Sequence, residues 1–468
     1  MDSYDVVVIG SGPAGQKAAI KCAKLGKRVA LVDRREVVGG RCLHLGTIPS
    51  KTIRSAIIQL SGYYERKFYG SDYRVKQDIT AQDLVFRCNA IIRREIDVIS
   101  DMLVRNGVNV MHGEGSFLDP HTVRVAGHAG EADLKAEYII VCTGSVAHVT
   151  RDLPFDKLHV LDTDDILLMS YLPKRMVILG GGVIGLEYAS MFSLLDIEVA
   201  VVSTYTQLLP FVDRQLVEAL ENHMHRQQVR FYLGEEVSTV ELRAPQQVHV
   251  QLKSGTELDA EMLLFAAQRW GNTLELNLAA AGLSAGPRGI LEVNQNYQTA
   301  QPHIYAAGDV IGFPALASTS IDQGRKAANH LLHVRDTPYA PQFPYGIYTF
   351  PDVSMVGDSE QELQKRGQQY EVGIGYYRES ARGQIIGDED GLVKLLFDPD
   401  SRRLLGVHVI GAEATELIHL GQAVLINSGT IDYFLDTVFN YPTLAEVYKL
   451  AALNGFNKLP ASRPMDHL

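Results

Sequence analysis

Residues 6 to 34 read VVVIGSGPAGQKAAIKCAKLGKRVALVDR. A β-branched apolar run leads into the spacing GxGxxG, at Gly10, Gly12 and Gly15, and a helical apolar pattern and a second apolar run follow. In such a unit the first glycine permits a tight turn, the second lets the backbone approach a pyrophosphate, and the third lets the helix pack on the strand. The stretch therefore predicts a doubly wound dinucleotide-binding module with phosphates at the helix N-terminus.

The same pattern occurs a second time. Residues 176 to 204 read MVILGGGVIGLEYASMFSLLDIEVAVVST and place glycines at Gly180, Gly182 and Gly185. One GxGxxG is a weak signal because glycine-rich turns are common, whereas two copies in full β–α–β context are much stronger. We therefore expect an α/β protein that binds two dinucleotides, each in its own Rossmann-like module.

The residue after each second strand bears on which dinucleotide binds. Asp33 lies 18 residues after Gly15, where a carboxylate can accept hydrogen bonds from ribose hydroxyls. The same offset in the second module gives Ser203, followed by Thr204, with neither acidic nor basic residues nearby. A carboxylate would repel the 2′-phosphate of NADP and an arginine cluster would select it. The hypothesis is that the second site accepts NAD and NADP; the alternative is an ordinary polar loop with selectivity set elsewhere.

Composition limits the partners. The chain has 468 residues, 46% hydrophobic and 21% charged, with a formal net charge of −11, which is typical of a globular protein of several domains. Nucleic acids and anionic membranes recruit an excess of Lys and Arg, so neither is expected as a partner. No apolar stretch approaches the roughly 20 residues that cross a bilayer. The first apolar run follows no basic segment, and we expect a cytoplasmic protein.

The four cysteines are Cys22, Cys42, Cys88 and Cys142. None has CxxC or zinc-site spacing, so we expect a reducing compartment and no metal site. Cys22 and Cys88 fall in apolar helical patterns and are expected in the core.

Several further segments carry a family resemblance. They are GGRCLHLGTIPSK from Gly39 to Lys51, Cys142-Thr143-Gly144, HIYAAGDVIGFPALA from His303 to Ala317, and FNYPTLAEVYKLAALNG from Phe439 to Gly455. With the first GxGxxG they strongly resemble, over nearly the whole chain, the two-dinucleotide-binding-domain flavoproteins, which include dihydrolipoamide dehydrogenase, glutathione reductase and mercuric reductase. The single cysteine before HLGTIPSK, the NYPT followed by AE, and GIYTFPDVSMVG from Gly346 to Gly357 most resemble the soluble pyridine nucleotide transhydrogenases of that family.

The resemblance implies a domain plan. Residues 1–148 would form an FAD-binding module, 149–272 an NAD(P)-binding module, 273–344 a central segment completing the FAD domain, and 345–468 an α+β interface domain. It also implies a homodimer or higher homo-oligomer, paired through the interface domains.

The resemblance also implies site residues. FAD would be held by Gly10, Gly12, Gly15, Asp33, Arg34, Gly40, Cys42, Thr47, Lys51, Gly113, Thr143, Gly144, Asp309 at the end of a strand, and Ala317. NAD or NADP would be held by Gly180, Gly182, Gly185, Glu187 at the start of a helix, Ser203, Thr204 and Gln268. Lys51 and Glu187 would meet beside the flavin, where the cation favours the electron-rich reduced ring and the carboxylate holds the cation.

The chain departs from the disulfide reductases of the family at two points. Those enzymes use two cysteines and a C-terminal His–Glu pair, but here Thr47 replaces the second cysteine and Tyr441 replaces the histidine, while Glu446 remains. Tyrosine, with an ordinary pKa near ~10, is a poor proton acceptor at neutral pH. A lone sulfur forms no internal disulfide. Cys42 is therefore expected as a small packing residue, and the alternative is a thiol that forms mixed disulfides or a sulfenic acid.

These departures suggest the function. The leading hypothesis is a ping-pong hydride transfer between NADPH and NAD through FAD, without a redox disulfide. An NAD(P)H:quinone reductase is the main rival, and a redox-sensing or assembly flavoprotein without turnover is the alternative from another class. The preferred nucleotide, the physiological direction and the true acceptor stay open.

Overall fold

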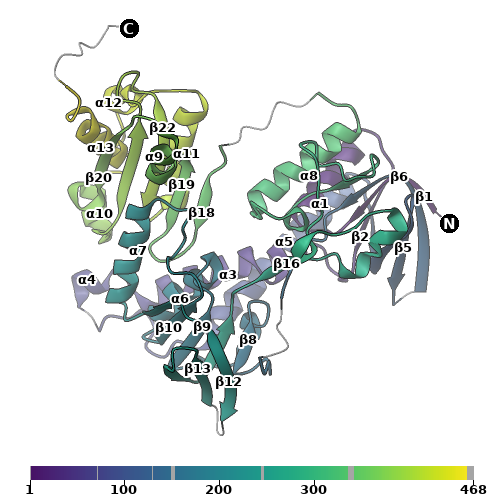
Figure 1. Cartoon of the computed structure of the whole chain (residues 1–468), viewed down its shortest axis with the longest axis horizontal. Coiled ribbons are helices and arrows are strands. Elements are labelled where there is room, and N and C mark those ends of the chain that lie inside the picture. The colour runs from purple at the N-terminus through teal and green to yellow at the C-terminus, as the bar shows by residue number, and fades with distance from the viewer. Residues whose placement is uncertain are drawn as a thin grey trace.

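The computed structural model describes residues 2–70, 72–128, 130–148, 153–243, 247–335 and 342–460. Figure 1 shows the N-terminus and the first strands on the right, the C-terminal part on the upper left, and the middle of the chain between and below them, with residues 47–69 running from the middle to the left. The chain therefore has three parts.

The first part is built on a mixed sheet with the strand order β3-β2-β1-β6-β5-β4 and with β17 paired to β6. Its strands are β1 (Asp2–Ile9), β2 (Val29–Asp33), β3 (Asn109–His112), β4 (Glu114–Asp119), β5 (Thr122–Gly127), β6 (Gly130–Val141) and β17 (Ile304–Ala306). Its helices are α1 (Pro13–Lys24), α2 (Gly40–His44), α3 (Thr47–Ser61), α4 (Arg66–Tyr69), α5 (Ala81–Arg105) and α8 (Ala317–Leu331). Because β17 pairs in parallel with β6, the chain returns to this sheet after passing through the second part.

Both faces of this sheet are covered. Along β1, Val6 and Val8 belong to one buried cluster with residues of α1, while Val7 and Ile9 belong to a second cluster on the other face. Such a near-continuous apolar strand is typical of a parallel sheet buried on two sides. Helices α1 and α8 cross closely, since a Cβ at Gly324 would lie 2.1 Å from the Ala14 carbonyl oxygen.

The second part has a parallel sheet of order β11-β10-β9-β15-β8 and an antiparallel sheet β12-β13-β14. Its strands are β8 (Val160–Asp162), β9 (Arg175–Leu179), β10 (Glu198–Ser203), β11 (Arg230–Leu233), β12 (Val237–Arg243), β13 (Gln247–Leu252), β14 (Glu257–Ala260) and β15 (Met262–Phe265). Its helices are α6 (Val183–Ser193) and α7 (Arg214–Arg226). Strands β7 (Ser145–Ala147) and β16 (Arg269–Gly271) pair with each other where the chain enters and leaves this part.

The third part has an antiparallel sheet of order β18-β19-β22-β21-β20. Its strands are β18 (Tyr345–Ile347), β19 (Val353–Gly357), β20 (Glu371–Tyr376), β21 (Leu392–Phe397) and β22 (Leu404–Ile410). Its helices are α9 (Glu360–Arg366), α10 (Ala381–Ile386), α11 (Ala414–Ile426), α12 (Asp432–Asp436) and α13 (Glu446–Phe456). Lys394 of β21, which is buried, donates a 2.8 Å hydrogen bond to buried Asp213 at the start of α7, so the third part is bound to the second.

The predicted fold class is confirmed: two doubly wound α/β modules and a C-terminal α+β part are present. Cys22 and Cys88 are buried, as expected. The domain boundaries stay predictions; the one at 148/149 adjoins residues 149–152, which lie outside the described residues. Among the residues described, no helix is both long and apolar enough to traverse a lipid bilayer.

Two local expectations were wrong. Asp309 does not end a strand, because β17 stops at Ala306 and Gly308, at φ +84°, turns the chain before Asp309 begins a 3₁₀ turn. Glu187 does not begin its helix, because α6 starts at Val183 and places Glu187 one turn in.

Candidate functional site

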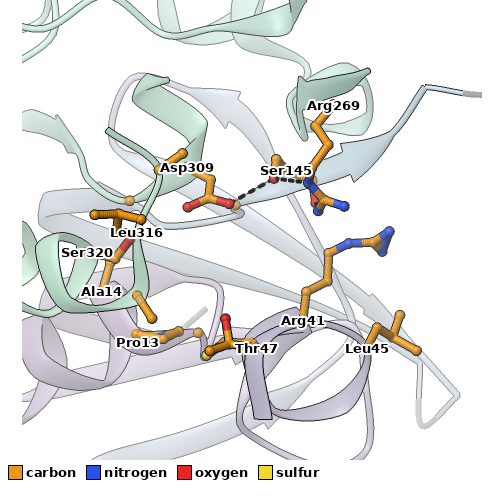
Figure 2. Close-up of a pocket in the computed structure, with 18 of the residues that line it drawn as sticks. Pro13, Ala14, Arg41, Leu45, Thr47, Ser145, Arg269, Asp309, Leu316 and Ser320 are labelled. Carbon is orange, nitrogen blue, oxygen red and sulfur yellow. Dashed lines mark hydrogen bonds between the residues drawn. The ribbon is translucent and has the colours of Figure 1, made fainter. Parts of the chain in front are cut away.

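A cavity of about 1050 Å³ is lined by residues of all three parts of the chain. Figure 2 shows a portion of it, with Pro13 and Ala14 of the first glycine turn, Thr47 of α3, and Asp309 around the same space. A volume near the upper end of ordinary ligand pockets suits a large cofactor together with a substrate. This cavity is the candidate site.

The first glycine turn is shaped to leave one side open. A Cβ at Gly15 would lie 1.8 Å from the Gly10 carbonyl oxygen, and a Cβ at Gly10 would lie 2.3 Å from the Cys142 carbonyl oxygen, so both positions exclude a side chain. A Cβ at Gly12 would meet nothing within 4 Å, and Gly12 lines the cavity. Only glycine at this position keeps the space that a diphosphate needs to approach the backbone.

The second glycine turn repeats this geometry. A Cβ at Gly185 would lie 1.9 Å from the Gly180 carbonyl oxygen, and a Cβ at Gly180 would lie 2.8 Å from the backbone of Ala266. Gly182 again has nothing within 4 Å of its Cβ position and lines the cavity. The chain therefore has two cradles of the same design, which is the arrangement that two dinucleotides require.

The first cradle fits FAD. Thr143 Oγ1 lies at the cavity wall, buried and without a hydrogen-bond partner among the residues that the structure describes. Buried polar atoms normally have a hydrogen-bond partner, and a ligand bound in the cavity can supply one to this hydroxyl. Next to it, Gly144 has φ +72° and open space where a Cβ would stand. With Gly12 these groups offer an open backbone and a free hydroxyl to a dinucleotide.

Asp33 also has an internal role. Its Oδ2 accepts hydrogen bonds from the Ser11 amide at 2.8 Å and the Ser11 hydroxyl at 2.5 Å, and its Oδ1 accepts one from the Arg35 amide at 2.9 Å. The carboxylate of Asp33 thus holds the glycine turn through hydrogen bonds within the protein. The sequence predicted its contact with a ribose but not this internal role.

The structure brings Lys51 and Glu187 together. Lys51 Nζ donates a 2.7 Å hydrogen bond to Glu187 Oε2, and Glu187 is only 5% exposed. The Tyr348 amide donates to Glu187 Oε1 at 2.9 Å, and the Tyr348 ring centroid lies 4.8 Å from Lys51 Nζ. One residue from each of the three parts therefore meets at this ion pair, and all three line the cavity.

A second ion pair, between Arg54 and Asp352, adjoins the Lys51–Glu187 pair along α3. Arg54, one turn after Lys51 on α3, pairs with Asp352 and donates a 3.0 Å hydrogen bond to the Thr349 carbonyl oxygen. The Phe350 amide donates to the Ser190 hydroxyl on α6 at 3.0 Å. Burial raises the pKa of Asp352 to about 6, with nearby Arg54 opposing the shift. The segment from Tyr348 to Asp352 is thus bound to both helices that carry the Lys51–Glu187 pair.

Cys42 lies at the cavity wall as a free thiol. Burial raises its pKa, while a hydrogen bond with the Thr47 side chain lowers it. The His44 ring is held by the backbone, since its Nε2 donates a 2.9 Å hydrogen bond to the Val38 carbonyl oxygen. The surroundings therefore favour an unreactive, protonated thiol.

The loop after β10 gives little selectivity. Ser203 is 4% exposed and its hydroxyl accepts a 3.2 Å hydrogen bond from the Tyr205 amide. Thr204 and Tyr205 are exposed. Gln268 lines the cavity, whereas Ser203 and Thr204 do not. No cationic group of this loop is placed to select a 2′-phosphate, so the nucleotide preference stays open.

Most of the expected FAD residues line the cavity: Gly10, Gly12, Asp33, Arg34, Gly40, Cys42, Thr47, Lys51, Gly113, Thr143, Gly144, Asp309 and Ala317. Expected residues that do not line it are Gly15, Gly180, Gly185, Ser203, Thr204, Tyr441 and Glu446. Sequence reasoning missed Arg41, Ser145, Asp164, Arg269, Trp270 and Tyr348, which do line it. Arg41 and Tyr348 stood inside segments that carry the family resemblance, GGRC and GIYTFPDVSMVG, and these segments were the signal that could have found them.

Tyr441 and Glu446 lie apart from this cavity. Tyr441 is 72% exposed. Glu446 begins α13, and its Oε2 is buried without a hydrogen-bond partner in the described part of the chain. Within one chain, neither residue is placed to act at the cavity.

The chain matches a known protein family over most of its length. The family model "Pyridine nucleotide-disulphide oxidoreductase" matches residues 4–324, and the dimerisation domain of the same family matches residues 343–452. A soluble pyridine nucleotide transhydrogenase of Mycobacterium bovis is 48% identical over 463 residues, covering 98% of this chain and 99% of the relative. A protein of that name from Colwellia psychrerythraea is 42% identical, covering 97% and 98%.

Solved structures share the whole architecture. The HOCl-induced flavoprotein disulfide reductase RclA from Escherichia coli, as its Cu(II) complex, superposes with a TM-score of 0.87 at 26% identity, covering 97% of this chain and 99% of that one. LpdA from Mycobacterium tuberculosis superposes with a TM-score of 0.88 at 24% identity, covering 97% and 99%, which shows the shared fold.

Proposed function

The chain belongs to the pyridine nucleotide-disulphide oxidoreductases and groups with their soluble pyridine nucleotide transhydrogenases, and from this we propose that it transfers hydride between NADPH and NAD with FAD as cofactor. The single observation that carries the proposal is the pair of matching glycine cradles, at Gly12 and Gly182, both open to one cavity. Two cradles at one cavity allow one dinucleotide to stay bound while another exchanges.

When bound, FAD supplies a two-electron carrier that takes hydride from one nicotinamide and returns it to another. The residues that would hold it are those of the first cradle, with Thr143, Asp33 and Asp309 around it. The overall reaction moves one hydride from NADPH to NAD and releases no proton, so it needs no acid or base. Tyr441 in place of a histidine and Thr47 in place of a second cysteine agree with that requirement.

Lys51 and Glu187 have the clearest role among the side chains. Glu187 accepts hydrogen bonds from Lys51 Nζ and from the Tyr348 amide, so the ammonium is held at a fixed place on the cavity wall. A fixed cation stabilises negative charge that develops near it, and it costs no reorganisation during the reaction. Glu187 acts as the positioning residue for Lys51.

The family's dimerisation domain indicates a homo-oligomer. We propose a homodimer in which Tyr441 and Glu446 face the partner subunit, because Tyr441 is exposed and the buried Oε2 of Glu446 lacks a partner among the described residues. We also propose a cytoplasmic location, in keeping with four free cysteines.

An anaerobic half-reaction experiment tests the function. The purified flavoprotein is reduced with stoichiometric NADPH, then NAD or a quinone is added while the flavin absorbance and NADH are followed. Transhydrogenation predicts rapid return of the oxidised flavin spectrum with NAD and equimolar NADH. If quinone restores the spectrum and NAD does not, the chain is a quinone reductase instead. If NADPH reduces the flavin too slowly for turnover, a sensing role replaces both.

A further inference from the structure

Arg41 occupies an unusual place beside the first cradle. It follows Gly40, whose Cβ position lies 2.7 Å from the Cα of Gly12, so α2 begins in direct contact with the glycine turn. No side chain fits between them, and the backbone of Arg41 is therefore fixed next to the open side of Gly12. Figure 2 shows the Arg41 side chain reaching from α2 toward Arg269 across the drawn pocket.

The guanidinium of Arg41 lies among other cations. Burial and the nearby Arg269, Arg34 and Arg35 lower its pKa to about 10, with Asp162 opposing them, so it remains charged at neutral pH. All four arginines line the cavity. A concentration of like charge at a cavity wall favours binding of an anion.

One carboxylate serves two of these arginines. Asp164, in the turn after β8, forms an ion pair with Arg41, and its other oxygen lies 4.0 Å from Arg269. Arg269 also donates to the Ser145 hydroxyl at 3.0 Å, and that hydroxyl donates to Asp309 at 2.9 Å. The Nε of Arg41 is buried without a hydrogen-bond partner in the described part of the chain. Arg41 is therefore only partly satisfied by the protein.

We propose that Arg41 binds the diphosphate of FAD directly and that Asp164 competes with the diphosphate for the same guanidinium. The inference rests on FAD as the cofactor of the proposed function, but not on which molecule accepts the hydride. Arginine suits the task because its planar fork forms paired, charge-assisted hydrogen bonds to phosphate oxygens. Lys51, the other cation of this helix pair, is already held by Glu187.

If Asp164 and the diphosphate compete for Arg41, substitutions at Arg41 and at Asp164 have opposite effects on FAD binding. If Arg41 binds the diphosphate, removing its charge weakens FAD binding, whereas removing the charge of Asp164 frees the guanidinium and strengthens it. If the pair only ties α2 to the second module, the two substitutions weaken FAD binding alike. Opposite signs from the two ends of one contact therefore test the proposal.

The test starts from the full-length holoenzyme. The protein is diluted until FAD dissociates, FAD is added back, and the Kd of FAD is measured. Trp270 is the only tryptophan in the chain and lines the cavity, so its fluorescence reports FAD binding without any turnover. We expect Arg41→Gln to raise the Kd about tenfold or more, Arg41→Lys to raise it less, and Asp164→Asn to lower it several-fold. Added salt should weaken FAD binding more steeply in the unsubstituted protein than in Arg41→Gln.

ADP and adenosine, added as competitors of FAD rebinding, locate the contact. Arg41→Gln should weaken competition by ADP and leave competition by adenosine unchanged. An unchanged Kd in Arg41→Gln, or weaker binding in Asp164→Asn, overturns the proposal, and an unchanged Kd in Asp164→Asn overturns the competition. Arg41→Lys keeps the charge and guards against a folding defect. A wild-type chain that binds no FAD would instead refute the proposed function.

Discussion

The two cradle glycines of the second module should separate binding from folding. At Gly182 the φ angle is −83°, which any residue adopts, and a Cβ meets no protein atom within 4 Å. At Gly185 a Cβ would lie 1.9 Å from the Gly180 carbonyl oxygen. Gly182→Ala therefore adds a methyl group to the cavity, while Gly185→Ala adds one to the packed turn.

The expected magnitudes differ in kind. Gly182→Ala changes only a helix N-cap residue without a side-chain bond, so the free energy of unfolding should fall by no more than about 1 kcal/mol. Its methyl group stands where a diphosphate approaches the backbone, and losing one charge-assisted hydrogen bond costs about 1.5–3 kcal/mol. The KM for NADPH should therefore rise about ten- to a hundredfold.

The assay follows the rate of anaerobic flavin reduction against NADPH concentration, with FAD content and Tm measured in parallel. Gly182→Ala should keep its FAD and nearly its Tm while losing affinity for NADPH and NAD alike. Gly185→Ala is the matched control and should lose stability, because the turn must open by more than an ångström to admit the methyl group. An unchanged KM in Gly182→Ala, or a wild-type Tm in Gly185→Ala, would refute this reading of the cradle.

Three further outcomes are expected. Cys42→Ser should keep hydride transfer within about tenfold, measured as kcat, since burial raises the pKa of the thiol and no second sulfur lies beside it; a larger loss would point to a reactive thiol. Glu187→Gln should keep FAD but slow its reduction by NADPH more than tenfold, because Lys51 loses its fixed partner; equal rates in stopped-flow mixing would contradict this. Burial raises the pKa of Asp352 to about 6, so the folded chain keeps this proton to higher pH than the unfolded chain does. The contribution of this proton to the free energy of unfolding is fully present below about pH 4 and is lost as the pH rises through about 6. Urea unfolding of wild type and Asp352→Asn should therefore diverge by up to about 3 kcal/mol between those pH values, the wild type falling, and parallel pH profiles would exclude the shift.

The sequence predicted those features whose physical cause is local. A glycine turn between a strand and a helix must use glycine at fixed spacing, so Gly10, Gly12 and Gly15 could be found without a structure. The core positions of Cys22 and Cys88 followed from helical periodicity in the same way.

Features that depend on contacts between distant segments produce no recognisable spacing of residues in the sequence. Arg41 and Asp164 form an ion pair although they are more than a hundred residues apart, and no pattern in either segment indicates the pairing. The stacking of Trp270 on His148, with ring centroids 3.7 Å apart, arises because β7 and β16 pair where the chain crosses between modules. Asp33 was expected at a ribose, but its bonds to Ser11 depend on how closely the turn approaches the strand end.

The convergence at Lys51 explains why the third part of the chain bears on redox chemistry as well as on assembly. Lys51 comes from the first module and Glu187 from the second, but the second oxygen of Glu187 is held by the Tyr348 amide of the third. Arg54 and Ser190 bind the same segment one turn farther along their helices. A shift of the segment from Tyr348 to Asp352 would therefore move the carboxylate, and with it the ammonium, at the cavity wall. The segment lies within residues 343–452, which the family's dimerisation-domain model matches, so the part of the chain that carries this domain also holds one side of the Lys51–Glu187 pair.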